Sequence, residues 1–167
     1  MMWVCRAGQK SVFADYYFST KKIYIPWDGF KYDLLKYQDR EALKMLVLIE
    51  KGDVARASVS NWAGQLYTFC HEMNIGDYVL IPFDHSKQFV LARISGDYEY
   101  SSENDNVLWH SRLIEIIVET IPCSIFNQQI RYSLGAYRTI FRAKYEKGIL
   151  AATNKYLEKE GIESGFR

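Results

Sequence analysis

The chain has 167 residues, a length that fits one domain and leaves little room for two. Its formal net charge is +1, so no overall field attracts the protein to nucleic acid or to a membrane, and any nucleic-acid site must be a local basic patch. The 49% of hydrophobic residues is ordinary for a globular domain, but 16% of the residues are aromatic, and part of that excess is available to line a binding surface.

The first part of the chain predicts two short strands around a helical segment. The apolar run 3–6 is typical of a strand, and the aromatic-rich residues 11–18 predict one or two helical turns. Residues 23–25 predict a second strand, which Pro26 ends because proline has no N–H to donate to a sheet. A turn over 27–29 follows this strand.

Two amphipathic helices are predicted next. Asp39 is a suitable N-cap for a helix that Gly52 ends, because aspartate accepts the free N–H groups of a first turn and glycine tolerates the conformation past the last one. A second helix begins at Ser58 or Ser60. Its Gly64 predicts close packing against another backbone or a ligand, because glycine in a helix costs about 1 kcal/mol relative to alanine. The apolar face of this second helix consists of Trp62, Leu66, Phe69, Cys70 and Met73.

The second half of the chain predicts mainly strands. The expected strands are 78–83, 89–94, 108–118 and 137–142, with a hairpin turn over 84–87 between the first two. The strand over 108–118 is long enough to bend, and Pro122 ends it. Two further helices are expected over 124–130 and 145–160. Strands of unequal length among several helices predict an α+β fold, a small β-barrel flanked by helices.

The cysteines argue against a zinc site. The three cysteines, Cys5, Cys70 and Cys123, include no pair with the two-residue spacing of zinc ligands, so we expect no metal and no other cofactor. An odd number of cysteines without a signal peptide is typical of a reduced, cytoplasmic protein. The sequence also contains no long apolar run, so we expect no membrane partner.

Catalytic motifs are equally absent. No strand carries the carboxylate-x-lysine pair with which metal-dependent nucleases hold their metal and their attacking water. Cys70 and His71 are adjacent on a predicted helix, so their side chains point about 100° apart and are not placed as a nucleophile and its base. We therefore expect a protein that is not an enzyme. An enzyme that uses Cys70, His71 or His110 is the lesser hypothesis.

Aromatic and polar residues at turns and helix starts point instead to binding. Flat aromatic walls stack on a base, and an amide or carboxylate such as Asn61 or Asp97 reads its Watson–Crick edge. The candidate base-binding residues are Trp27, Asn61, Trp62, Asp97, Tyr98 and Tyr100. The candidates for phosphate contacts are Arg6, Lys10, Arg131, Arg138 and Arg142.

Several blocks of sequence resemble a known family. The blocks are WVCRAG at 3–8, IYIPW at 23–27, SNWAGQLYTFCHEMNIGDYVLIP at 60–82, ISGDYEY at 94–100 and YSLGAYRTIFR at 132–142. In this order they resemble the N-terminal domain of Mrr-like predicted restriction endonucleases, over about residues 3–143. The 60–82 block is also similar to the EVE domain. EVE and YTH domains are PUA-like: small β-barrels with flanking helices that hold a flipped or modified base in an aromatic cage.

The resemblance implies a function as well as a fold. It places Asn61 and Trp62 at a pocket with Trp27 as a wall, and Asp97, Tyr98 and Tyr100 at its rim or floor. It implies base flipping by a DNA-binding module that recognises a modified base, such as a methylated one, as the targeting part of a restriction or antiviral defence system.

The same resemblance leaves partners and alternatives open. It implies a nuclease domain or subunit as partner. Residues 1–145 would form the PUA-like, EVE-like domain, and 146–167 a C-terminal helix or the start of a linker to an effector domain. The chain departs from the family at Pro26, where the related pattern has glycine. A YTH- or PUA-type RNA reader and a protein-interaction domain remain the alternatives.

Overall fold

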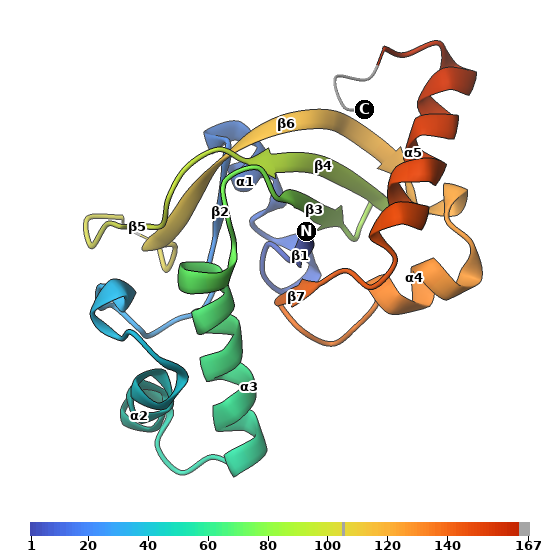
Figure 1. The fold of residues 1–167 in the computed structure, drawn as a ribbon. Coiled ribbons are helices and arrows are strands. Elements are labelled where there is room, and N and C mark those ends of the chain that lie inside the picture. The colour runs from blue at the N-terminus through green and yellow to red at the C-terminus, as the bar shows by residue number, and fades with distance from the viewer. Residues whose placement is uncertain (105, 164–167) are drawn as a thin grey trace.

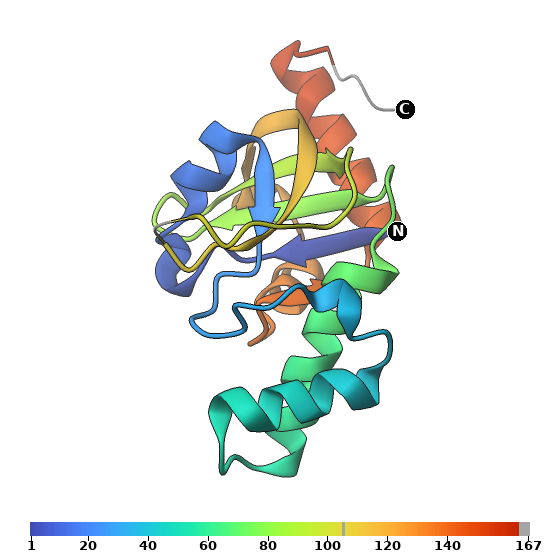
Figure 2. The ribbon, with the colours of Figure 1, turned by 90° about the vertical axis from the view of Figure 1, so that its left-hand side faces the viewer.

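A computed structural model describes residues 1–104 and 106–163 of the chain. In these residues the strands form one curled, mixed sheet, a half-barrel with helices packed around it (Figures 1 and 2). The predicted α+β class, a small barrel flanked by helices, is therefore confirmed. The strand order is β2-β6-β4-β3-β1-β7, and the short β5 pairs with the start of β6 on the edge opposite to β2.

The strands and helices have the following bounds. The strands are β1 (Met2–Cys5), β2 (Lys22–Tyr24), β3 (Tyr78–Phe83), β4 (Gln88–Ile94), β5 (Glu99–Tyr100), β6 (His110–Pro122) and β7 (Ile140–Arg142). The helices are α1 (Ala14–Thr20), α2 (Arg40–Lys51), α3 (Arg56–Tyr67), α4 (Gln128–Leu134) and α5 (Glu146–Glu160). A π-helical turn, Thr68–Glu72, continues α3. The predicted strand over 78–83 and the helix with Asp39 as N-cap are confirmed.

Both faces of the central sheet are buried. Successive side chains of a strand point to opposite faces, and along β1 they divide accordingly: Trp3 and Cys5 join one core cluster, Met2 and Val4 the other. Helices α1, α2 and α3 contribute to the first cluster, and α4 and α5 to the second. A strand covered on both faces is apolar throughout, which explains the unbroken apolar run at 2–5.

The bend expected in the long strand is present in β6. Its pairing with β4 shifts register twice, between Phe89 and Leu91 and between Leu91 and Ala92. Such bulges curl a strand. As a result β6 pairs with β4 along its second half and with β2 and β5 at its start. This one strand joins the two parts of the half-barrel.

Helices α2 and α3 form a hairpin that projects from the sheet (Figure 1). Gly64 packs closely, but against a side chain rather than another backbone: a Cβ atom there would lie 3.0 Å from Nη1 of Arg40 at the start of α2. The Arg40 guanidinium also lies 2.7 Å from Oε1 of Glu72 and over the ring of Tyr67. α3 begins at Arg56, earlier than the serines at which we expected it.

Two predictions near the end of the chain have wrong bounds. The helix expected over 124–130 begins only at Gln128, because the Asn127 side chain accepts the N–H of Ile130 and so caps it there. The strand expected over 137–142 is limited to Ile140–Arg142. The N–H of Thr139, just before this strand, is bound by the side chain of Gln65 in α3, so the preceding residues form a loop.

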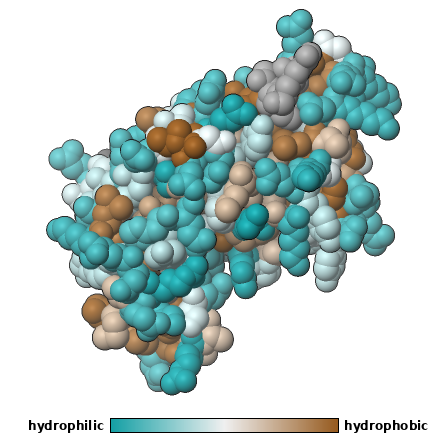
Figure 3. All heavy atoms as spheres, viewed as in Figure 1, coloured by the Kyte–Doolittle hydropathy of each residue, from teal (hydrophilic) through white to brown (hydrophobic). Residues whose placement is uncertain are grey.

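The described helices can be compared with what a membrane span requires. On the face seen in Figure 3, hydrophobic side chains are scattered among hydrophilic ones. Over residues 1–104 and 106–163, no helix has the length and apolar character needed to cross a membrane.

A buried arginine connects the sheet to the end of α3. Arg112 in β6 is 3% exposed, and its guanidinium donates to the carbonyl oxygens of Phe69 at 3.1 Å, Met73 at 2.9 Å and Gly96 at 3.2 Å. Burial lowers the pKa of Arg112, and the negative charge of Asp97 opposes this shift. Because the last carbonyl groups of a helix have no partner within it, this arginine satisfies groups that would otherwise be buried unpaired.

A second polar network holds the loop after β2. His110 is 1% exposed, and its Nε2 donates to the Phe30 carbonyl oxygen at 2.7 Å. Its Nδ1 therefore accepts the Tyr98 hydroxyl, at 2.6 Å, and that hydroxyl oxygen accepts the N–H of Leu34. This arrangement requires a neutral imidazole. Burial lowers the pKa of His110 to about 4, partly offset by the bond to Phe30.

We expect Arg112→Met to destabilise the fold. The methionine fills a similar volume, but the carbonyl groups of Phe69, Met73 and Gly96 lose their donors. Each buried unpaired group costs about 1–3 kcal/mol, and relief of the buried charge offsets part of this, so we expect a net loss of about 2–4 kcal/mol. Urea unfolding measures it, with the exposed Arg56→Met as control. Equal stability of both variants would contradict this role.

We expect acid to weaken the fold through His110. Its folded-state pKa of about 4 lies below the ordinary value of 6.5, so below pH 6.5 the unfolded chain binds a proton that the folded chain cannot. The contribution of His110 to the free energy of unfolding is therefore complete above pH 6.5. It is lost as the pH falls toward 4, by about 2 kcal/mol between pH 7 and pH 5. In urea unfolding, the stability of His110→Asn should depend less on pH than that of the wild type. His85→Asn, a substitution in an exposed turn, should leave this dependence unchanged. If the stability of His110→Asn fell with pH in parallel with that of the wild type, His110 would not be the group responsible.

Candidate nucleic-acid interface

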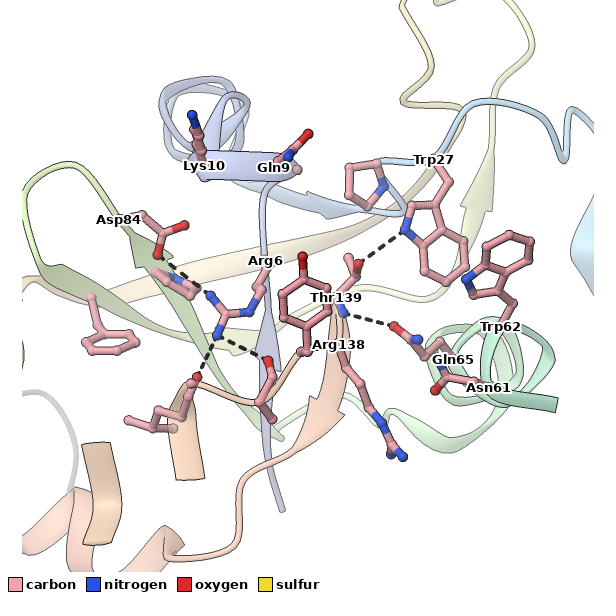
Figure 4. A pocket seen from close by; sticks show the side chains of 18 of the residues that line it. Arg6, Gln9, Lys10, Trp27, Asn61, Trp62, Gln65, Asp84, Arg138 and Thr139 are labelled. Atoms are coloured by element: carbon pink, nitrogen blue, oxygen red, sulfur yellow. Dashed lines mark hydrogen bonds and ion pairs between the residues drawn. The ribbon is translucent and has the colours of Figure 1, made fainter. Parts of the chain in front are cut away.

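A pocket of about 890 Å³ lies between the sheet and the α2–α3 hairpin. It is lined by the loop after β1, the residues after β2, the middle and last part of α3, the β3–β4 hairpin with Cys123, and the end of α4 with the loop that follows (Figure 4). Its volume is in the range of about 300–1,000 Å³ that small-molecule sites have. That volume is large enough for a single nucleotide.

The structure brings two of the predicted aromatic residues together in this pocket. Trp27 enters from the segment after β2, and Trp62 from α3, and Figure 4 shows both indole rings on the same side of the pocket. Nε1 of Trp27 donates to Oγ1 of Thr139 at 3.2 Å, which fixes the ring. Lys51, which does not line the pocket, lies 5.2 Å from the ring of Trp62. Both walls are held by neighbours.

Gln65, one helical turn after Trp62 on α3, fixes the same side of the pocket (Figure 4). Its side chain is 6% exposed, and its Oε1 accepts the N–H groups of Thr139 at 3.0 Å and Ile140 at 2.9 Å. Two N–H donors require an oxygen acceptor, so these bonds also settle which end of the carboxamide is which. Thr139 thus connects α3, Trp27 and the start of β7.

Two amide groups remain available to a ligand. With Oε1 of Gln65 occupied, its Nε2 makes no hydrogen bond within the described residues and is not fully buried. Asn61, one helical turn earlier on α3, makes no side-chain hydrogen bond in the same part of the chain. Residues four apart lie on one face of a helix, so both amides face the pocket together (Figure 4).

The pocket is positive although the chain is nearly neutral. The basic residues that line it are Arg6, Lys10, Arg131 and Arg138. One acidic residue lines it, Asp84, and this carboxylate lies 3.7 Å from Nη1 of Arg6. Four of the five predicted phosphate-contact residues are therefore gathered here. Lys10, Arg131 and Arg138 have no ion-pair partner among the described residues.

Arg6 has a structural bond of its own. Its Nη2 donates to the carbonyl oxygen of Leu134 at 2.7 Å, in addition to the contact with Asp84. Its guanidinium is thus shared between the pocket wall and the end of α4, whereas the three other basic side chains are free for a ligand.

Four predicted site residues lie outside this pocket. Tyr98 is buried, and its hydroxyl is hydrogen-bonded to His110. Tyr100 stacks on the same imidazole with ring centroids 5.4 Å apart. Asp97 is exposed, and its charge acts on Arg112. Arg142 is exposed on β7. The resemblance implied that Asp97, Tyr98 and Tyr100 lie at the rim or floor of the pocket. The chain after β4 instead takes Tyr98 into the core, and Asp97 and Tyr100 to another surface.

Among the lining residues that the sequence did not predict, Gln65, Thr139 and Tyr137 matter most for the shape of the pocket. The sequence does hold a sign of the role of Gln65, because a polar residue beside Leu66 on the buried side of a helix needs a hydrogen-bond partner. Thr139 and Tyr137 were assigned to a strand, and nothing local distinguishes them from strand residues.

The residues considered for catalysis have structural positions. Cys70 is buried, and burial raises the pKa of its thiol. Nε2 of His71 lies 3.0 Å from the carbonyl oxygen of Tyr37, and His110 belongs to the core network. Over residues 1–104 and 106–163, no three His, Cys, Asp or Glu side chains are grouped so that they could hold a metal ion.

Comparison with known proteins yields one family. No curated protein and no solved structure matches the chain. The model of the family described as "Domain of unknown function (DUF8426)" matches residues 2–143, which include every strand and every residue that lines the pocket. Because this match spans most of the chain, the protein belongs to the DUF8426 family.

Proposed function

We propose that this protein is a non-catalytic nucleic-acid-binding module that takes a flipped, modified base of DNA into the pocket between Trp27 and Trp62. One observation carries the proposal: a single pocket combines two tryptophans, the open amide of Asn61, the free Nε2 donor of Gln65 and an excess of basic side chains. Each of these is what one part of a nucleotide needs.

The tryptophans suit the faces of a base. Stacking of a base on an aromatic side chain contributes about 1–3 kcal/mol. Because Thr139 fixes Trp27 and Lys51 lies against Trp62, neither ring needs to be ordered when a ligand enters. Walls that are already in place keep more of the stacking energy as affinity.

The amides suit the edge of a base. Asn61 offers both a donor and an acceptor, and Nε2 of Gln65 adds a donor. A donor–acceptor pair of this kind matches the Watson–Crick edge of a base extruded from a duplex. Because Gln65 is fixed by two backbone N–H groups, its free donor has a fixed direction, and this favours discrimination between bases.

The positive lining suits the phosphates on either side of that base. Lys10, Arg131 and Arg138 are exposed and unpaired within the described residues, in a chain whose net charge is only +1. Charge is therefore concentrated where a backbone would pass. The resemblance to Mrr-like enzymes supports a role as the targeting part of a cytoplasmic restriction or defence system, with a nuclease domain or subunit as partner.

The test is binding at fixed, moderate salt to three matched DNA duplexes: unmodified, with one 5-methylcytosine, and with one N6-methyladenine. We expect the wild type to prefer one modified duplex. Trp62→Ala and Trp27→Ala should each weaken that preference about tenfold, in line with the stacking contribution of one base. Trp109→Ala, outside the pocket, is the matched control, and thermal unfolding confirms that each variant is folded.

Equal, weak binding to all three duplexes would rule out base recognition in DNA. Competition with matched RNA oligonucleotides then tests the RNA alternative. Binding to no nucleic acid at low salt would leave a protein-interaction domain, because even non-specific binders hold DNA under that condition.

A further inference from the structure

The segment from Arg131 to Arg138 exposes two tyrosines to solvent. Among large hydrophobic side chains of the described residues, Tyr137 and Tyr132 have the highest exposures, 103% and 87%. Neither side chain makes a hydrogen bond or a ring contact within the described residues. A large aromatic side chain that contacts nothing in its own fold is a candidate contact for a partner.

The backbone around Tyr137 is held although its side chain is free. Arg6 donates to the carbonyl oxygens of Leu134 and Ala136. The N–H of Arg138 donates to the carbonyl oxygen of Ala136 at 2.9 Å, which places Tyr137 at the centre of a three-residue turn. Oε1 of Gln65 accepts the N–H of Thr139, the residue after Arg138. Tyr137 therefore projects from the apex of a turn that is fixed at both ends.

The surroundings of Tyr137 favour nucleic acid over protein as its partner. Tyr137 lines the pocket, together with Arg131 and Arg138, neither of which has an ion-pair partner among the described residues. Tyrosine and arginine also occur together in protein interfaces, but here they border a pocket with one acidic residue, Asp84, already paired with Arg6. Aromatic and positive groups side by side are what a nucleic-acid strand contacts.

We infer that Tyr137 enters the DNA duplex and fills the space that the flipped base leaves, while Arg131 and Arg138 bind the flanking phosphates. The inference rests on the proposed function and names a residue that makes flipping possible. Extruding a base removes stacking from both of its neighbours, and a planar ring inserted at the same level restores part of it. Tyr137 lines the pocket and is fully exposed, so its ring is free to contact a strand whose base enters there.

The experiment compares three DNA probes: a duplex with one 5-methylcytosine or N6-methyladenine, whichever the wild type prefers, the same duplex with that base mismatched, and the modified strand alone. Tyr137→Ala should weaken binding to the paired duplex about tenfold, as expected for loss of one stacking contact. The loss should be smaller on the mismatched duplex, where extrusion is easier, and absent on the single strand.

Two variants serve as controls. Tyr137→Phe keeps the ring and should bind all three probes as the wild type does. Tyr132→Ala removes an equally exposed tyrosine of the same segment that does not line the pocket, and should leave the ratios between probes unchanged.

The outcomes separate this inference from the proposed function. Equal losses of Tyr137→Ala on all three probes would show a general stacking contact and overturn insertion, as would no loss on any probe. If Trp62→Ala still loses the preference in either case, the proposed function survives. A wild type without base preference would overturn both.

Discussion

The pocket depends on one buried carboxamide oxygen. Oε1 of Gln65 binds two successive backbone N–H groups at the start of β7, a strand at the edge of the sheet. Those N–H groups would otherwise be unpaired beneath α3, and a buried unpaired group is costly. The same bonds hold Thr139 where Trp27 can donate to its hydroxyl. The α3 helix, the segment after β2 and the loop before β7 are thus locked together by one side chain.

The molecule separates its rigid polar groups from those that it leaves free. Arg112 and His110 are buried and fully engaged, and they hold the end of α3 and the loop after β2 against the sheet. At the pocket, Asn61 has open hydrogen-bonding capacity. A polar group without a protein partner costs little at a surface, because water can bind to it. A rigid pocket with such groups is therefore suited to exchange bound water for a ligand.

Local signals in the sequence predicted the elements well where they were strong. Asp39 with its following apolar period defined α2, and the bend of β6 was expected from its length. The pocket was predicted in part: Trp27, Trp62 and Asn61 share it, Trp27 from the turn after β2 and the other two from within α3 rather than from its start. Tyr98 went to the core instead, since its hydroxyl finds His110 across the sheet, a contact between distant residues that no local pattern records.

The place of β1 in the sheet has a consequence for how the chain folds. This first strand lies between β3 and β7, with Val4 beside both Leu80 and Phe141. During synthesis it cannot acquire its second neighbour until nearly the whole domain has left the ribosome, and parallel pairing with β3 is itself a slow, long-range step. Until β7 has been made, the nascent domain therefore carries an open, apolar strand edge at which it is prone to aggregate.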